Sequence, residues 1–262
     1  MPATWTDATA EYTTMLRAAG RSPGTIRLHR HYLHHLTGHA RSPWRATPVQ
    51  LRTALATHRW GPETRKSARA VYVSFYRWAH TEGYTPANPA ANLPAITVPV
   101  GRPRPAPEKV LARALAGADQ RTRTMLLLAA YAGLRCAEIS RARSSDLVEG
   151  LLHVTGKGGK ARVVPIVHPE LVETFARADG WLFPGRIDGH LSPSTVTHIL
   201  SAALPDGWTG HTLRHRMATR AYAGTRDLLA VGELLGHSRP ETTKRYVQMP
   251  MDALLAAINA AA

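Results

Sequence analysis

The sequence predicts a mainly α-helical protein of two domains, with one small β-hairpin in the second domain. Three observations support this prediction. Apolar residues recur at helical spacing over most of the chain, a proline-rich segment interrupts that pattern once, and two short alternating runs flank a glycine-rich turn. We therefore expect a helical domain over residues 1–91, a linker over 92–107 and a second domain over 108–262.

The first domain is expected to be a small helical bundle. Thr6 or Asp7 is the expected N-cap of its first helix, which ends near Ala19. The other three helices begin at prolines, a residue that the first helical turn favours, namely Pro23, Pro48 and Pro62. Four helices in about 85 residues are typical of a bundle.

The linker, residues 92–107, reads NLPAITVPVGRPRPAP and contains five prolines. Proline has no N–H to donate to a helix or a sheet, so this stretch is expected to be extended and semi-rigid. Arg102 and Arg104 lie within it, where they are candidates to cross a phosphate backbone.

The second domain is expected to be helical around a hairpin. Leu151–Thr155 and Ala161–Val167 alternate as strands do, and the turn between them reads GKGGK. The helical pattern covers residues 108–115, 122–132, 169–178, 193–203, 211–223, 227–235 and 240–247, with a last helix from Met251 to the end.

The charge balance points to a polyanion as partner. The chain has 33 Lys and Arg against 18 Asp and Glu, a net charge of +15, and 44% hydrophobic residues. Residues 1–100 carry 12 cations and 4 anions and the remainder 21 and 14, so both halves share the excess. Nucleic acid is the usual partner of such a chain. A genome that favours arginine codons explains the same excess.

Composition also excludes several classes of protein. An apolar fraction of 44% excludes a chain that is mainly disordered. A single Cys excludes a disulfide framework and a cysteine-rich zinc site. The apolar runs are too short to span a membrane, and the N-terminus has no secretory signal pattern.

Several polar residues are candidates for chemistry, although each has a structural explanation when taken alone. Arg135 follows the end of an apolar helix, and taken alone it is best interpreted as a surface arginine paired with Glu138. Lys157 stands between glycines at the hairpin tip, either as a solvated lysine or as one that reaches into a nucleic-acid groove. A nucleotide-binding P-loop is excluded, because Gly158 follows Lys157 where that motif needs Ser or Thr.

The segment HTLRH places His211, Arg214 and His215 on one helix face. A zinc site is disfavoured there, since the segment lacks the glutamate of the H-E-x-x-H motif and Arg214 would lie beside the metal. Arginine and histidine together suit a phosphate better. His237 follows a glycine helix stop, and Tyr246 lies on a short basic segment.

Together, these residues resemble the tyrosine recombinases, the family of the phage integrases and Xer recombinases. The resemblance rests on AGLRCAEI around Arg135, TGKGGKARVVPI around Lys157, HTLRH, LGHS, and a tyrosine at the family's spacing. It covers nearly the whole chain. It implies a two-domain, C-shaped DNA clamp, in which a helical core-binding domain precedes the catalytic domain.

The resemblance also implies a site without metal or cofactor. Arg135 and Arg214 would bind the phosphate oxygens, and Tyr246 would attack the phosphorus to form a 3′-phosphotyrosine. His211 would accept the tyrosine proton, and Lys157 would protonate the leaving 5′-oxygen.

Other residues would support this chemistry. His237 would donate a hydrogen bond to the phosphate, Glu138 would orient the arginine or its helix, and His215 would support the cluster or serve a buried structural role. The candidate DNA contacts are Arg102, Arg104, Lys160, Arg162, Lys244 and Arg245.

The implied partners are double-stranded DNA with core-type sites, a homotetramer formed through the C-terminal helix, and an accessory directionality factor. The expected activity is site-specific integration or excision of a phage or other mobile element. Xer-like dimer resolution and a non-catalytic DNA-binding protein on the same scaffold are the alternatives. The expected location is the cytoplasm of a bacterial host, on the nucleoid.

Overall fold

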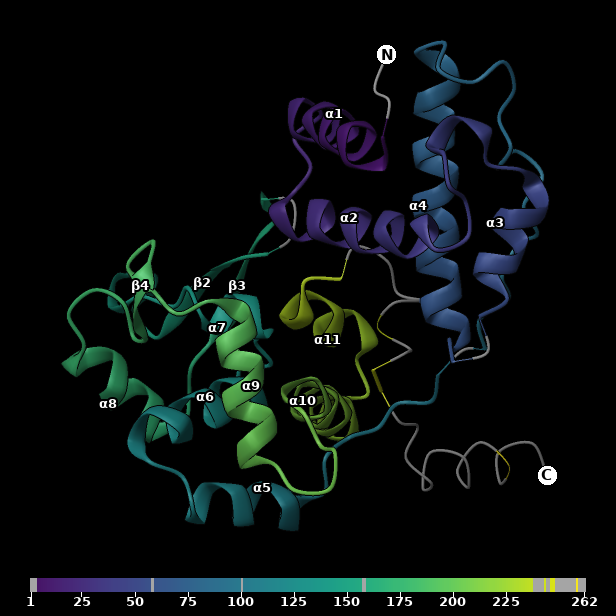
Figure 1. The fold of residues 1–262 in the computed structure, drawn as a ribbon. Coiled ribbons are helices and arrows are strands. Elements are labelled where there is room, and N and C mark those ends of the chain that lie inside the picture. The colour runs from purple at the N-terminus through teal and green to yellow at the C-terminus, as the bar shows by residue number, and fades with distance from the viewer. Residues whose placement is uncertain are drawn as a thin grey trace. The chain divides into compact units, whose positions relative to one another are not determined.

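The structure is a computed structural model that describes residues 4–57, 59–99, 101–156, 159–237, 243, 246, 247 and 258. The chain divides into two compact units, residues 1–100 and 101–262 (Figure 1). Both units are mainly helical, and the second contains one small antiparallel sheet, which confirms the predicted fold class.

The N-terminal unit contains α1 (Trp5–Ala18), α2 (Pro23–Thr37), the short 3-10 helix η1 (Pro43–Arg45), α3 (Pro48–Leu55) and α4 (Pro62–Thr81). The three helices predicted from prolines begin where expected. The predicted N-cap of the first helix is wrong, because the hydroxyl of Thr4 accepts the N–H of Asp7 at 3.2 Å and α1 begins at Trp5. The indole of Trp5 is buried and donates to the carbonyl of Ala40, which anchors this earlier start.

Aromatic side chains of α1 and α4 form the core of the N-terminal unit. Tyr12, Tyr72, Phe75 and Tyr76 are fully buried. The ring of Phe75 contacts Tyr12 edge-on at 5.2 Å and Trp78 at 5.6 Å between centroids. Offset and edge-on pairs of this kind add to the stabilisation that burial alone gives. Helix α2 adds the buried Leu33 and Leu36 to this core and leaves most of its polar side chains exposed.

The C-terminal unit begins with α5 (Glu108–Ala116), α6 (Gln120–Tyr131), α7 (Cys136–Ile139) and the 3-10 helix η2 (Ser144–Asp146). Strands β1 (Leu147–Val148), β2 (Leu151–Thr155) and β3 (Ala161–Pro165) form an antiparallel sheet in the order β1-β2-β3. The predicted hairpin is present, although β3 ends two residues earlier than expected. The remaining elements are α8 (Pro169–Arg177), β4 (Pro184–Ile187), α9 (Pro193–Ala203), α10 (Gly210–Thr225) and α11 (Leu228–Leu235).

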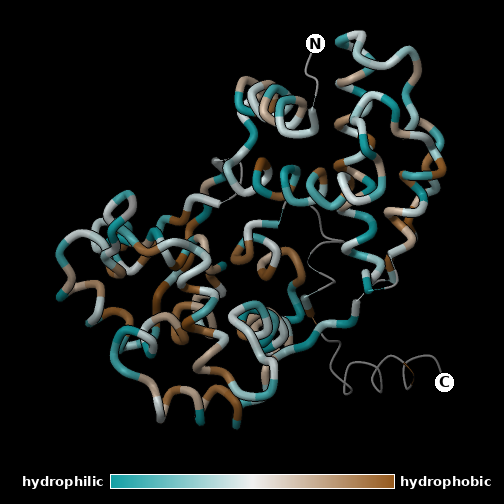
Figure 2. The backbone as a smooth tube through the Cα atoms, in the orientation of Figure 1, coloured by the Kyte–Doolittle hydropathy of each residue, from teal (hydrophilic) through white to brown (hydrophobic). Residues whose placement is uncertain are grey.

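Helix α6 is the centre of the C-terminal core. Residues 124–130 are buried without interruption, which marks a helix covered on all sides. Helices α5, α8, α9 and α10 pack around it. In Figure 2 hydrophobic residues are spread over the elements of this unit, and α10, like α2 of the other unit, also carries many hydrophilic residues. The helix thus fixes the positions of α7 and α10, which carry candidate site residues.

Some expectations differ from the structure or fall outside it. The sequence pattern did not predict five short elements of four residues or fewer, namely η1, α7, η2, β1 and β4. The helix expected over 240–247 is described only at residues 243, 246 and 247, and nearly all of the last expected helix lies outside the described residues. In the part of the chain that the structure describes, no helix is both long and apolar enough to cross a membrane.

Candidate active site

Arg135 lies at the N-terminus of α7, immediately after a left-handed turn. Gly133 has φ +63°, a conformation that side chains with a Cβ rarely adopt. This turn ends α6 and lets the N–H of Leu134 reach the carbonyl of Leu128 at 3.2 Å. Arg135 is then the N-cap residue of α7, and its side chain remains 36% exposed. Its guanidinium is therefore accessible to a ligand.

Glu138 is the carboxylate around which the arginines gather. Its oxygens accept the backbone N–H of Arg135 at 2.8 Å and Nη1 of Arg135 at 2.9 Å. Arg162 donates to both oxygens at 2.8 Å, and Nη1 of Arg214 lies 3.8 Å away. Burial raises the pKa of Glu138, but the bonds from Arg162 and Arg135 outweigh it and lower that pKa to about 2. The carboxylate is thus charged at neutral pH.

Arg162 corrects a sequence expectation. It was expected to contact DNA, but its side chain is only 6% exposed and all three guanidinium nitrogens are bonded inside the protein. Besides the two bonds to Glu138, Nε donates to the carbonyl of Leu234 at 2.9 Å. The position of Arg162 in β3 explains this burial. Side chains of a strand point alternately to its two faces, and the neighbours Ala161 and Val163 point to the exposed face. In this arrangement its guanidinium is not available to a phosphate.

Helix α10 carries His211, Arg214 and His215 on one face, as predicted. Arg214 is fully buried, and its Nη atoms donate to the carbonyls of Gly133 and Leu235. A guanidinium has five N–H donors, so several remain for another ligand. Burial, then the charge of Arg135, lowers the pKa of Arg214 to about 9, which still leaves it charged at neutral pH.

The ring of Tyr246 lies among three histidines and an arginine. It stacks on His215 with centroids 4.5 Å apart, meets His211 edge-on at 5.2 Å, and lies 4.7 Å from His237. The guanidinium carbon of Arg214 is 5.8 Å from its centroid, within the range of a cation–π contact. Residues from α10, the end of α11 and the C-terminal segment therefore meet at this tyrosine.

His237 enters the cluster through a second left-handed turn. Gly236 has φ +65° and ends α11. Nδ1 of His237 then lies 3.1 Å from the hydroxyl of Thr243, and Nε2 lies 3.5 Å from Nη2 of Arg214. Thr243, which the sequence did not suggest, thus holds the histidine that faces Tyr246.

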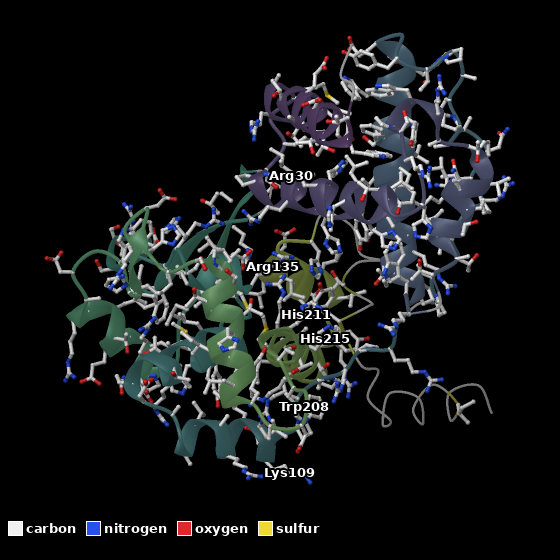
Figure 3. All side chains as sticks on the ribbon, viewed as in Figure 1. Arg30, Lys109, Arg135, Trp208, His211 and His215 are labelled. Atoms are coloured by element: carbon white, nitrogen blue, oxygen red, sulfur yellow. The ribbon has the colours of Figure 1, made fainter. Side chains whose placement is uncertain are left out.

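The three histidines are neutral at pH 7. Burial, followed by neighbouring positive charge, lowers the pKa of His211, and it lowers those of His215 and His237 to about 4. The imidazole of His211 can therefore accept a proton. Figure 3 shows Arg135, His211 and His215 together in one region of the C-terminal unit.

The other candidate residues are divided between the surface and the undescribed segments. Arg102, Arg104 and Lys160 are exposed, and the guanidinium of Arg104 lies 4.2 Å from the ring of Trp208. The remaining candidates, Lys157, Lys244 and Arg245, lie outside the described residues. Among described residues, no group of three or more His, Cys, Asp or Glu is arranged to hold a metal ion.

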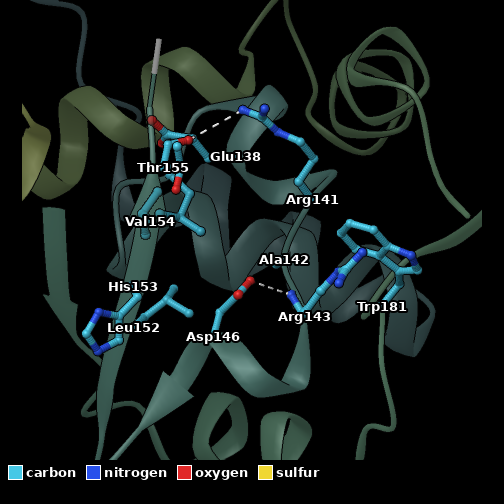
Figure 4. A pocket seen from close by; sticks show the side chains of 11 residues that line it. Glu138, Arg141, Ala142, Arg143, Asp146, Leu152, His153, Val154, Thr155 and Trp181 are labelled. Atoms are coloured by element: carbon cyan, nitrogen blue, oxygen red, sulfur yellow. Dashed lines mark hydrogen bonds between the residues drawn. The ribbon is translucent and has the colours of Figure 1, made fainter. Parts of the chain in front are cut away.

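A pocket of about 290 Å³ lies beside Glu138, between β2 and the segment that follows α7 (Figure 4). Arg141 and Arg143 line it, and the guanidinium of Arg143 lies 3.5 Å from the ring centroid of Trp181. Among the described residues, no tyrosine or lysine lines this pocket. We therefore place the candidate active site at Tyr246, where the histidines and arginines converge.

Comparison with known proteins identifies the family of this chain. The sequence profile of the phage integrase family matches residues 107–252, more than half of the chain. The chain belongs to the phage integrase family. Its relatives include the tyrosine recombinase XerC of Methylobacterium sp., which is 32% identical over 97% of this chain and 92% of the relative. XerC of Rhodospirillum centenum is 33% identical over 77% of this chain and 66% of the relative. The protein is thus a tyrosine recombinase, an enzyme of site-specific DNA recombination.

Solved structures of tyrosine recombinases share the fold. A lambda integrase dimer bound to a COC′ core site matches with a TM-score of 0.77 and 20% identity, over 94% of this chain and 77% of that one. XerH bound to a palindromic difH substrate matches with a TM-score of 0.70 and 18% identity, over 95% and 83%. At these identities the likeness establishes the architecture of this recombinase.

Proposed function

We propose that this recombinase cleaves and rejoins DNA strands through a 3′-phosphotyrosine intermediate on Tyr246. The observation that carries the proposal is the charge balance around that tyrosine. Among the residues that the structure describes here, Arg135, Arg162 and Arg214 surround one carboxylate, that of Glu138, and the adjacent histidines are neutral. A buried excess of positive charge is costly unless an anion compensates it. A phosphodiester that enters next to Tyr246 supplies that anion.

The cleavage step follows from these groups. The phenolic oxygen of Tyr246 attacks the phosphorus, the bond from phosphorus to the 5′-oxygen breaks, and a bond from the phenolic oxygen to phosphorus forms. A free tyrosine loses its proton only near about pH 10, so attack at neutral pH needs a base and nearby positive charge. His211 takes the proton, and Arg135 and Arg214 hold the non-bridging oxygens. Rejoining is the reverse reaction and needs no added energy source, because the covalent phosphotyrosine conserves the phosphodiester linkage.

The leaving 5′-oxygen needs a proton, for which we propose Lys157. In the sequence Lys157 lies between β2 and β3, so this hairpin would bring the lysine to the DNA strand that leaves with the 5′-oxygen. His237 would donate to a non-bridging oxygen. No carboxylate pair suited to a two-metal mechanism is needed, since the guanidiniums carry the charge that metal ions would otherwise supply.

The N-terminal unit supports DNA binding through a cationic pocket of about 730 Å³ between α1 and α2. Arg17 lines it from α1, and Arg27 and Arg30 line it from α2. Threonines also line this pocket, and hydroxyl and guanidinium groups both bind phosphate oxygens. Arg30 is labelled in Figure 3. We propose that the side chains of this pocket contact the phosphate backbone of core-type duplex DNA. Residues 1–91 would then form a DNA-binding domain, which the linker over 92–107 joins to the catalytic domain.

For the biological reaction we propose integration or excision of a phage or other mobile element by a homotetramer on two DNA sites. A lambda integrase tetramer bound to a Holliday junction shares the fold, with a TM-score of 0.72, which supports this assembly. The XerC relatives favour dimer resolution as the second candidate. The position of the cleavage site separates the two, because an integrating element cuts beside its own gene.

The test is a covalent-trapping assay with DNA fragments that flank the gene, quenched in detergent and resolved on a denaturing gel. Wild-type protein should form a DNA adduct, and Tyr246→Phe should form none. Tyr131→Phe is the matched control and should retain the adduct. A Tyr246→Phe protein that still forms the adduct refutes the proposal, and binding without any adduct favours a non-catalytic DNA-binding protein.

A further inference from the structure

Arg162 stands at a strand position that otherwise takes apolar side chains. The inward positions of β2 and β3 hold Leu152, Val154 and Val164, all buried, and Arg162 is the charged member of this set. Burying a guanidinium is unfavourable unless its donors are paired. The partners of Arg162 therefore indicate why an arginine is present here.

Three segments that carry proposed catalytic residues meet at this guanidinium. Nη1 and Nη2 bind the carboxylate of Glu138 in α7, three residues after Arg135. Nε binds the carbonyl of Leu234 in the last turn of α11, three residues before His237. Arg162 itself follows the glycine-rich turn of the hairpin, five residues after Lys157 in the sequence.

The contact with α11 is also a close steric one. A Cβ added at Gly236 would lie only 2.9 Å from Cδ of Arg162. The left-handed turn that leads into His237 therefore packs directly on the stem of Arg162. A shift of that stem displaces either the turn or the carboxylate.

We propose that Arg162 is a positioning residue for DNA cleavage, which holds Glu138 and the turn before His237 in the geometry that strand cleavage requires. Oε1 of Glu138 accepts from Nη1 of Arg162 at 2.8 Å and from Nη1 of Arg135 at 2.9 Å. The guanidinium of Arg135 is thus bonded to a carboxylate that the buried Arg162 holds in place. The inference rests on the proposed function.

The test measures adduct formation and DNA binding separately. The probe is an oligonucleotide duplex that spans the mapped cleavage site, with a nick just 3′ of the scissile phosphate so that the released 5′-hydroxyl fragment diffuses away. At saturating protein, Arg162→Met should form adduct about 100-fold more slowly, since a misplacement of about 1 Å has that effect. Mobility shifts with the same duplex should show unchanged affinity.

Two further variants separate positioning from charge. Arg162→Lys keeps the positive charge but lacks the bidentate fork, so its rate should lie between those of wild type and Arg162→Met. Arg177→Met removes a guanidinium that is 77% exposed on α8 and should cleave at the wild-type rate. If Arg162→Met does not fold, Arg162→Lys carries the comparison and must still cleave more slowly than wild type.

A double-mutant cycle tests whether Arg162 acts through Glu138. In a Glu138→Gln background, Arg162→Met should add little further loss, because the shared contact is already gone. The inference would be overturned if the double variant lost cleavage by the product of the two single losses. It would also be overturned if Arg162→Met lost binding and cleavage equally, or cleaved at the wild-type rate. A wild-type protein without a Tyr246-dependent adduct would instead overturn the proposed function and the inference with it.

Discussion

Tyr246 stacks on His215, with ring centroids 4.5 Å apart and an angle of 23° between the ring planes. His215 is buried, and its Nδ1 has no hydrogen-bond partner among the described residues. Burial, then His211 and Arg214, lowers the pKa of His215 to about 4. His215 therefore offers Tyr246 a neutral, flat surface that restricts the ring, whereas His211 is placed to handle its proton.

The lowered pKa of His215 predicts that the folded protein loses stability in mild acid. Its pKa is about 4 in the folded protein against an ordinary 6.5, so between these values the unfolded chain binds a proton that the folded protein does not. The stabilisation is complete above pH 6.5 and declines as the pH falls toward 4, by about 2 kcal/mol at pH 5. His237 acts in the same direction.

Urea unfolding at pH 7 and pH 5 checks this prediction. His215→Gln should lose less stability than wild type over that interval. His153→Gln, which changes an exposed histidine on β2, is the matched control and should follow the wild type. Equal losses in all three proteins would show that His215 is not responsible.

Glu138→Gln should destabilise the C-terminal unit strongly. The substitution leaves three guanidiniums around a neutral amide, and breaking a buried ion pair in this way typically costs about 3–5 kcal/mol. Because the folded pKa of Glu138 is about 2, the carboxylate's stabilisation is present above its ordinary pKa of 4.5 and is lost as the pH falls toward 2.

Denaturant titrations at neutral pH measure that loss. Glu173→Gln is the control, since Glu173 is 57% exposed and pairs with Arg177 on the surface of α8. It should change stability by less than about 1 kcal/mol. Similar unfolding midpoints for the two variants would contradict the role assigned to Glu138.

Gly133→Ala should impair both stability and cleavage. Gly133 and Gly207 both have left-handed backbones, with φ +63° and +69°, so alanine at either position should cost about 1 kcal/mol. At Gly133 the new Cβ would also lie 2.1 Å from Cε of Met217, whereas nothing lies within 4 Å of one at Gly207. The Gly133 carbonyl binds Arg214, so only Gly133→Ala should also slow adduct formation. Equal cleavage by the two alanine variants would argue against this coupling.

The starts of several helices and the position of the hairpin could be predicted because local signals define them. Prolines begin α2, α3 and α4, and the alternation of β2 and β3 around glycines defines the hairpin. Short elements escaped prediction. Helix α7 has only four residues, and its start depends on the left-handed turn at Gly133 rather than on an apolar period of its own.

The residue types of the candidate site could be predicted, but the hydrogen bonds that hold its side chains could not. His211, Arg214 and His215 share a face because helical spacing requires it, and the structure brings Arg135, His237 and Tyr246 to them. The partners of Arg214 are backbone carbonyls of Gly133 and Leu235, which no side-chain pattern reveals. A signal for Arg162 was present, since it occupies an inward position of an alternating strand, where a charged residue needs a buried partner.

Salt dependence tests the contribution of positive charge to binding. If about 8 phosphates are neutralised per protomer, log K should fall against log[salt] with a slope near about −7. Replacing both Arg27 and Arg30 by alanine should reduce that slope by about 2, because each would lose one phosphate contact. Arg52→Ala on α3, outside the pocket between α1 and α2, should leave it unchanged. A slope near zero in the wild type would contradict electrostatic binding.

The most direct test of the central claim is the identity of the residue that bears the DNA. After trapping, digestion with nuclease and trypsin should leave a nucleotide remnant on the C-terminal tryptic peptide, residues 246–262, whose single tyrosine is Tyr246. We predict that mass spectrometry finds the phosphate-linked remnant on this peptide and on no other. A remnant on a peptide that contains Tyr131 or Tyr222, or on a serine elsewhere in the chain, would contradict the assignment of Tyr246 as the nucleophile.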